Sequence, residues 1–284
     1  MTYELLDSGS GRKLEQFQDI ILARPCSQAV WTRQENESVW QKAHGSFERV
    51  EQKGWSTKHN LPDAWVLETH GIKFNLKTTD FGHLGVFPEQ RPFWKWIKET
   101  ISSSTRPLRV LNLFAYSGGS TIAAAQGGAE VCHLDASKGM VQWARENAEL
   151  NNLSKAPIRW IVEDVTKFLQ REIKRGSFYD AIILDPPSFG RGAKGEIFKI
   201  EEEINNLLTL VNTLLTNDPA FVLFSCHTPG FTPVAMKQLL QQSITHKGII
   251  QEGEMLLKGD SHKTPFAIPS GTFALWRASW TSSI

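Results

Sequence analysis

A carboxylate, two prolines, a hydroxyl and an aromatic ring follow one another directly after an apolar run, in Asp185, Pro186, Pro187, Ser188 and Phe189. Each proline fixes its φ at about −65° and lacks an N–H donor, so the carbonyl groups here are acceptors held at fixed angles. Such acceptors, beside a carboxylate, suit an amino group or the edge of a base turned out of its helix, and the aromatic ring can stack on that base. A stiff turn without chemistry is the alternative interpretation.

Three further residues could line a nucleotide site, because each follows a predicted strand. Gly118 comes after the strand in VLNLFAYSGG, where glycine allows a positive φ and a close approach of ligand to backbone. Asp135 closes the next strand, where a carboxylate can accept both hydroxyls of a ribose. Asp164 follows a third strand and can accept from an adenine amino group, with Val165 as an apolar neighbour. Helix capping is the alternative role of both acids.

The type of nucleotide follows from what the glycine turn lacks. The G-x-G-x-x-G pattern that places a pyrophosphate on a helix N-terminus is not present after this strand. The sequence therefore predicts an adenosine ligand without a diphosphate, and S-adenosyl-L-methionine fits that description.

Two routes of methyl transfer are open at these residues. On a nitrogen, Asp185 and the Pro186 carbonyl would accept hydrogen bonds from an amine and direct its lone pair toward the methyl group. On C5 of a pyrimidine, a thiolate must first add at C6, and Cys226 ends the next predicted strand. His227 could lower the pKa of that thiol. A buried structural cysteine is the alternative, since cysteine is among the most buried residue types.

Alternating strands and helices from about residue 93 onward would position these groups. The runs LRVLNLF, EVCHLD, IRWIV, YDAIIL and AFVLFSC are typical of strands, and helical stretches separate them. The pattern predicts an α/β fold with a doubly wound, mostly parallel, Rossmann-like sheet and an antiparallel hairpin near the C-terminus. Ligands bind beyond the carboxyl ends of the strands in such sheets, where every candidate above falls.

The beginning of the chain has a different pattern. Turn signals alternate with short β-type runs such as AWVLETHGIKFNLKTT, which predicts a small β-rich lobe over residues 1–92, with a possible role in substrate recognition. Residues 93–284 would form the methyltransferase domain. Six of the ten tryptophans fall in or just after the lobe, and core filling is their main interpretation, with base stacking as the alternative: Trp31, Trp40, Trp55, Trp65, Trp94 and Trp96.

The charge balance, apolar runs and cysteine count of the chain limit which binding partners are expected. Lys and Arg total 31 against 30 for Asp and Glu, so a nucleic acid must meet a local basic face. Arg191, Lys194 and Lys199 are candidates for such a face. No apolar run approaches the ~20 residues of a membrane span, and the first residues do not form a signal peptide. Three distant cysteines without a CxxC pair fit a reducing compartment and argue against a zinc site. These features predict a cytoplasmic protein with no membrane or metal partner.

Several motifs together resemble a known family. GHLGVFPEQR, VLNLFAYSGGSTIAAAQGGA, HLDASKGMVQWARENAELN, DAIILDPPSFGRG and FSCHTPG, over roughly residues 70–284, resemble the class I S-adenosylmethionine-dependent methyltransferases. More narrowly, they resemble the bacterial ribosomal RNA large-subunit methyltransferase I group, which makes 5-methylcytosine. Longer members of that group begin with an RNA-binding module that is not recognisable here. The group commonly has S-C-S where this chain has Ser225-Cys226-His227.

The resemblance implies specific roles. The cofactor would be lined by Phe114, Tyr116, Ser117, Gly118, Asp135, Asp164 and Asp185, and Gln90 and Arg91 of PEQR, in place of D-Q-R, would approach its methionine part or the substrate. The expected enzyme methylates RNA, first of all cytosine C5 of large-subunit ribosomal RNA, with Cys226 as nucleophile and Asp185 orienting the base. The alternatives are N-methylation of an RNA base without a covalent step and a non-catalytic module that binds S-adenosylmethionine with RNA or protein.

Overall fold

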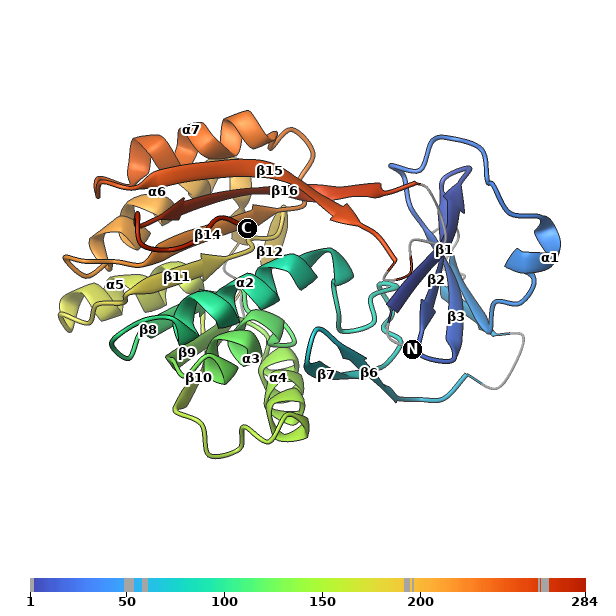
Figure 1. Ribbon diagram of the computed structural model, residues 1–284, viewed down its shortest axis with the longest axis horizontal. Coiled ribbons are helices and arrows are strands. Elements are labelled where there is room, and N and C mark those ends of the chain that lie inside the picture. The colour runs from blue at the N-terminus through green and yellow to red at the C-terminus, as the bar shows by residue number, and fades with distance from the viewer. Residues whose placement is uncertain are drawn as a thin grey trace. The chain divides into compact units, whose positions relative to one another are not determined.

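The structure is a computed structural model that describes residues 3–48, 54–57, 61–191, 195, 197–259, 261 and 266–284 (Figure 1). The chain divides into two compact units, one of Met1–Arg91 with Leu256–Ser270 and one of Pro92–Met255 with Gly271–Ile284. Within the described ranges, no helix has the length and apolar character needed to cross a membrane. The predicted division into domains at residues 92 and 93 stays a prediction.

A seven-stranded sheet is the centre of the second unit, in the order β10-β9-β8-β11-β14-β16-β15. Its strands are β8 (Arg109–Leu113), β9 (Glu130–Asp135), β10 (Ile158–Val162), β11 (Ala181–Leu184), β14 (Phe221–Cys226), β15 (Ile249–Leu257) and β16 (Ile268–Arg277). All neighbours from β10 to β14 pair in parallel, whereas β16 pairs antiparallel with β14. The doubly wound, mostly parallel sheet with a closing hairpin is thereby confirmed.

The order of the strands locates a ligand crevice. Following the chain from β8, the next two strands lie on one side of it, and β11 and β14 lie on the other. The direction of winding therefore reverses between β8 and β11. In open α/β sheets ligands bind at such a switch point, outside the carboxyl ends of the strands.

Helices cover both faces of this sheet because alternate side chains of a strand point to opposite faces. On one face, Leu111 and Phe224 pack in a core that includes Phe168 and Leu208. On the other face, Trp96 packs edge-on against Phe221, with ring centroids 4.9 Å apart. The helices of the first face are α5 (Val165–Lys174), α6 (Ile200–Thr213) and α7 (Pro233–Ser243), and those of the second include α2 (Arg91–Ser102), α3 (Gly119–Gln126) and α4 (Lys138–Leu150).

Short polar side chains fix where the helices begin. Ser137 Oγ accepts a hydrogen bond from Met140 N at 3.3 Å and caps α4, as its position before the helical run predicts. Thr232 caps α7 through Ala235 N in the same way. These two helices consequently start shortly after β9 and β14, so the loops after those two strands are short and anchored at both ends.

The first unit is β-rich, as predicted. A five-stranded sheet has the order β1-β2-β3-β4-β5, and a separate hairpin pairs β6 with β7. The bounds are β1 (Tyr3–Gly9), β2 (Arg12–Phe17), β3 (Ile20–Pro25), β4 (Gly45–Glu48), β5 (Gly54–Thr57), β6 (Trp65–Thr69) and β7 (Ile72–Leu76), with a short helix α1 (Glu37–Trp40) and the 3₁₀ turn η2 (Pro88–Gln90). Trp40 is buried and donates to the buried carboxylate of Asp7 at 2.8 Å, so this tryptophan fills the core.

Candidate active site

The loop after β8 has an unusual backbone. Phe114 and Tyr116 have φ values of 54° and 50°, and Gly118 has a φ of 91°. Positive φ is uncommon outside glycine and costs of order 1–3 kcal/mol at each such residue, so the surrounding structure must hold it. Asn147 of α4 does part of this, because its side-chain amide donates to the Ser117 carbonyl at 2.9 Å. The predicted glycine turn is therefore a tightly constrained loop.

Asp135 anchors the same loop from the end of β9. Its Oδ2 accepts from Tyr116 N at 3.0 Å and its Oδ1 accepts from Ser137 N at 2.8 Å. Burial raises the pKa of this carboxyl above its usual value, and the two backbone donors partly offset that effect. Because Ser137 is the cap of α4, capping is not the role of Asp135. Each carboxylate oxygen can accept a further hydrogen bond, such as one from a ribose hydroxyl.

Asp164 is a helix cap. Its Oδ1 accepts from Lys167 N at 3.0 Å at the start of α5. The alternative role that the sequence left open is thus present, and it occupies one oxygen; acceptance from an adenine amino group by the other oxygen stays a prediction. Val165 is buried with the core that α5 covers, together with Phe168.

Two strand-end loops meet at Asp185, which follows β11 directly. Its Oδ1 lies 3.3 Å from Nδ1 of His227, and both side chains are about one-third exposed or less, at 28% and 34%. Ser188 Oγ lies 2.8 Å from Thr228 Oγ1, which makes a second contact between the same two loops. The stretch after β11 and the stretch after β14 therefore form one polar surface at the carboxyl edge of the sheet.

Cys226 lies beside that surface but faces away from it. The residue is 1% exposed and belongs to the core that contains Met236 of α7. Thr228 N donates to its Sγ at 3.4 Å. Burial raises the pKa of the thiol, and the negative charge of Asp185 adds to this, while the hydrogen bond from Thr228 and the neighbouring His227 oppose it. A thiol with a raised pKa stays protonated at neutral pH and is a weak nucleophile.

The remaining predicted residues divide between the two units. Phe189 is half exposed on β12 (Phe189–Arg191) of the second unit. Gln90 and Arg91 are both buried in the first unit. The Arg91 guanidinium lies over the ring of Tyr3, 4.7 Å from its centroid, and Nε donates to the Pro88 carbonyl at 2.8 Å. These contacts give Arg91 a structural role within its unit, and its approach to cofactor or substrate stays a prediction.

Three comparisons bear on this arrangement. A family model described as S-adenosylmethionine-dependent methyltransferase matches residues 19–234. A solved S-adenosylmethionine-dependent methyltransferase from Agrobacterium tumefaciens is 38% identical, with a TM-score of 0.93 over 98% of this chain and 90% of that one. The chain belongs to the S-adenosylmethionine-dependent methyltransferases.

Curated relatives of this methyltransferase are named as ribosomal RNA methyltransferases. Ribosomal RNA large subunit methyltransferase I of Aeromonas salmonicida is 30% identical over 73% of this chain, and methyltransferase K/L of Pseudoalteromonas translucida is 33% identical over 58%. The match spans 52% of the first relative and 23% of the second, so this chain corresponds to about half or less of their length.

The methyltransferase uses S-adenosylmethionine, and the strand-end residues fit such a ligand. The Asp135 carboxylate lies beside the loop after β8, in which Gly118 has a positive φ. A Cβ on Gly118 would lie only 3.0 Å from Cβ of Ala144 on α4, so a side chain at this position would crowd that helix. Phe114 and Tyr116 precede the turn and pack on Phe198 and Trp143, with ring centroids 5.2 and 6.3 Å apart, and their contact with the cofactor stays a prediction.

Gly118→Ala is expected to lower both the stability and the cofactor affinity of the methyltransferase. An alanine at this φ costs about 1–2 kcal/mol in unfolding free energy, and the crowding against Ala144 adds to it. Thermal unfolding and calorimetric titration with S-adenosylmethionine would measure the two effects.

Gly128→Ala is the matched control, since Gly128 has a similar φ of 96° but nothing lies within 4 Å of the position that a Cβ would take there. It should lose stability through backbone strain and keep its cofactor affinity. Equal cofactor affinities for the two variants would contradict a role of the Gly118 turn in binding.

Two residues that support the site have no role in the sequence-based predictions. Thr228 contacts both Ser188 and Cys226, and Asn147 holds the Ser117 carbonyl. Both lie in stretches that carry the family resemblance, FSCHTPG and HLDASKGMVQWARENAELN, and this membership is the signal that could have found them. Their contacts depend on the packing of α4 and of the loop after β14.

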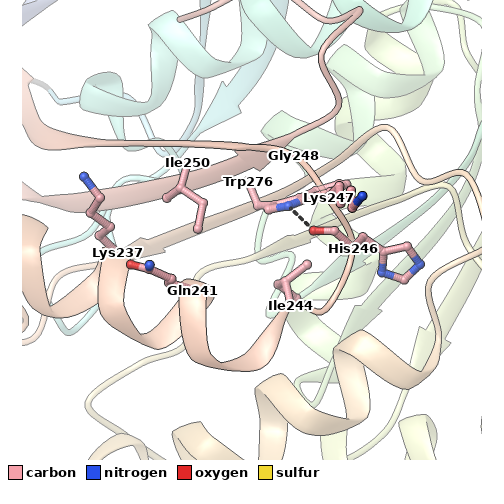
Figure 2. A pocket seen from close by; sticks show the side chains of 8 residues that line it. All are labelled: Lys237, Gln241, Ile244, His246, Lys247, Gly248, Ile250 and Trp276. Atoms are coloured by element: carbon pink, nitrogen blue, oxygen red, sulfur yellow. Dashed lines mark hydrogen bonds between the residues drawn. The ribbon is translucent and has the colours of Figure 1, made fainter.

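A separate open pocket of about 350 Å³ lies between α7 and the β15–β16 hairpin, and none of the predicted site residues lines it (Figure 2). Trp276 donates to the His246 carbonyl at 3.2 Å beside it. In register, Trp276 pairs with Val222 near the start of β14, whereas Cys226 pairs with Thr272. The pocket is therefore displaced along the strands from the carboxyl edge of the sheet, where the candidate residues lie.

Proposed function

We propose that this methyltransferase transfers a methyl group to a base of large-subunit ribosomal RNA. The observation that carries the proposal is the joining of the loops after β11 and β14, through Asp185 with His227 and Ser188 with Thr228. This surface combines a partly exposed carboxylate with the half-exposed ring of Phe189, and the two prolines between them lack an N–H donor. The names of the curated relatives supply the RNA class.

A nitrogen of the base is the acceptor that the geometry supports best. Asp185 and the Pro186 carbonyl would accept the N–H groups of an amine, which keeps the nitrogen lone pair directed toward the methyl group. Phe189 would stack on the ring of the base and hold it in place. The bound cofactor supplies an electrophilic methyl group on its sulfonium. The nitrogen loses one proton as it is methylated, and Asp185, with His227 Nδ1 at 3.3 Å, would carry that proton away.

Methylation of cytosine C5 through an adduct with Cys226 is the second candidate. The observation that favours it is the position of Cys226 at the end of β14, next to His227 and within electrostatic reach of Asp185. This route requires the buried thiol to turn out of the core and to lose its proton against a raised pKa. The nitrogen route requires neither change, and we therefore rank it first.

The test of the proposed function is mass spectrometry of nucleosides from ribosomal RNA of cells with and without the gene. Loss of an N-methylated base supports the first candidate, and loss of 5-methylcytidine supports the second. An unchanged set of modified nucleosides, together with no label transfer from S-adenosylmethionine to purified ribosomal RNA, would overturn the proposal.

Cys226→Ala separates the two candidates. Under nitrogen transfer, the variant keeps its methylation rate within about threefold and loses about 1–2 kcal/mol of stability, because a buried side chain is shortened. Cys132→Ala is the control, since Cys132 is also buried and its thiol pKa is raised to about 11. A rate near zero for Cys226→Ala alone would instead establish the cysteine route. Label transfer and thermal unfolding are measured on both variants.

A further inference from the structure

A two-stranded ribbon follows the Asp185 loop directly. Its strands are β12 (Phe189–Arg191) and β13 (Ile197–Lys199), paired antiparallel. Phe189 lies opposite Lys199, and Arg191 lies opposite Ile197. Because side chains alternate along a strand, these four share one side of the ribbon, which we call the outer ribbon face. All four are exposed, with Phe189 at 50% and Ile197 at 58%.

The opposite side of the ribbon is fixed to the cofactor loop. Phe198 is buried, and its ring centroid lies 5.2 Å from that of Phe114, next to the constrained turn after β8. At the base of the ribbon, Ile200 N donates to the Ser188 carbonyl at 3.2 Å, where α6 begins. The paired strands are thus held at the active-site edge of the sheet with the outer ribbon face turned to solvent.

The outer ribbon face combines exposed apolar side chains with cations. Phe189 and Ile197 offer apolar area, and the Arg191 guanidinium lies 5.8 Å from the centroid of the Phe189 ring. Lys199 Nζ lies 2.8 Å from a carboxylate oxygen of Glu202, and both of these side chains are at least half exposed. An exposed ion pair of this kind contributes little, so the ammonium remains available to a phosphate.

From these contacts we infer that the outer ribbon face binds the unpaired RNA strand that flanks the target base. Sites for single-stranded nucleic acid combine side chains on which bases stack with cations that follow the backbone. A duplex exposes phosphates but keeps its base faces covered, so it would leave the exposed Ile197 without a partner. The inference rests on the proposed function and adds to it a substrate class: a target base within a single-stranded segment.

Ile197 and the two cations give separable tests with matched controls. The probe is a fluorescein-labelled RNA of about 12 nucleotides, within the range of single-strand sites, compared with its blunt duplex. Ile197→Ala is expected to weaken single-strand binding about fivefold. The control is Ile249→Ala, at an isoleucine of β15 that is 44% exposed, and it should leave the binding unchanged.

The double variant Arg191→Ala, Lys199→Ala tests the two cations. It is expected to lower the slope of log affinity against log salt by about 1.4, at about 0.7 for each lost phosphate contact. Lys155→Ala, an exposed lysine elsewhere, keeps the slope.

The outcomes distinguish this inference from the proposed function. Equal single-strand affinities for Ile197→Ala and Ile249→Ala, or an equal loss of duplex binding, would overturn the ribbon as a single-strand site. Unchanged titration with S-adenosylmethionine and unchanged thermal unfolding verify that the variants are folded. If the wild-type chain binds the single strand as expected but transfers no label to ribosomal RNA, the proposed function is wrong and the ribbon remains a single-strand binding site. Residues 192–194 and 196, including the predicted phosphate contact Lys194, lie outside the described residues.

Discussion

Asp185→Asn is expected to reduce the rate of methyl transfer about 10³-fold while S-adenosylmethionine affinity stays within about threefold. The asparagine keeps the shape of the side chain but replaces one acceptor oxygen with a donor. A base amine would then face an NH₂ group, and its lone pair would no longer be directed to the methyl group. The contact between Oδ1 and His227 Nδ1 at 3.3 Å would also lose its charge.

Asp218→Asn provides the control for this change, since Asp218 is an exposed acid of the same unit, on the loop before β14. Single-turnover label transfer to ribosomal RNA measures the chemical step, and calorimetry measures cofactor binding. An Asp185→Asn enzyme that retained more than a tenth of the wild-type rate would show that this carboxylate does not orient the base. A loss confined to cofactor affinity would assign Asp185 to the cofactor side instead.

The sheet could be predicted from the sequence because its central strands are buried on both faces. In β11 and β14 every residue is buried, which gives the apolar runs AIIL and FVLF. The residues that follow these strands must then lie at one edge, because parallel strands end together. The proximity of Asp185 and the loop after Cys226 follows from that rule, and the structure brings His227 and Thr228 to Asp185 and Ser188.

The direction in which a side chain points could not be predicted in the same way. A slip of one residue along β14 would turn Cys226 to the other face, and nothing in FSCHTPG fixes that choice. The register does fix it, because Cys226 shares its face with Val222 and Phe224, against α6 and α7. The ribbon of β12 and β13 was also not expected, since each strand has three residues and neither forms a long apolar run.

The backbone of the cofactor loop is a further feature that sequence patterns do not contain. Glycine at position 118 signals a turn, but the positive φ of Phe114 and Tyr116 depends on tertiary contacts. Leu134 contributes through its carbonyl, which accepts from Ala115 N at 3.0 Å, and Asp135 contributes through its carboxylate. Asp135 therefore has two roles, since it shapes the loop and, as we propose, binds the ribose.

These two roles predict a large effect for Asp135→Asn. Both carboxylate oxygens accept backbone N–H groups, from Tyr116 at 3.0 Å and Ser137 at 2.8 Å. Asparagine has a single acceptor oxygen, so its NH₂ group would face one of these donors. Loss of one charge-assisted hydrogen bond to the loop and one to a ribose hydroxyl, at about 1.5 kcal/mol each, lowers S-adenosylmethionine affinity about 100-fold. Asp218→Asn serves again as the unaffected control.

The pH dependence of binding provides an independent check on Asp135, because burial raises its pKa above the usual value of about 3.9. Acceptance of ribose hydroxyls favours the charged form, so cofactor affinity should fall as the pH drops through this raised pKa, at a higher pH than for an ordinary aspartate. The free energy of unfolding changes with pH in the opposite direction. Because the pKa of Asp135 is raised in the folded state, the contribution of this residue to stability is present at low pH and is lost as the pH rises. Calorimetric titrations at successively lower pH, with thermal unfolding at each pH, should therefore show wild-type affinity declining without a matching loss of stability from this residue. The Asp135→Asn variant should show no such decline, and parallel pH profiles for the two proteins would exclude Asp135 as the ribose acceptor.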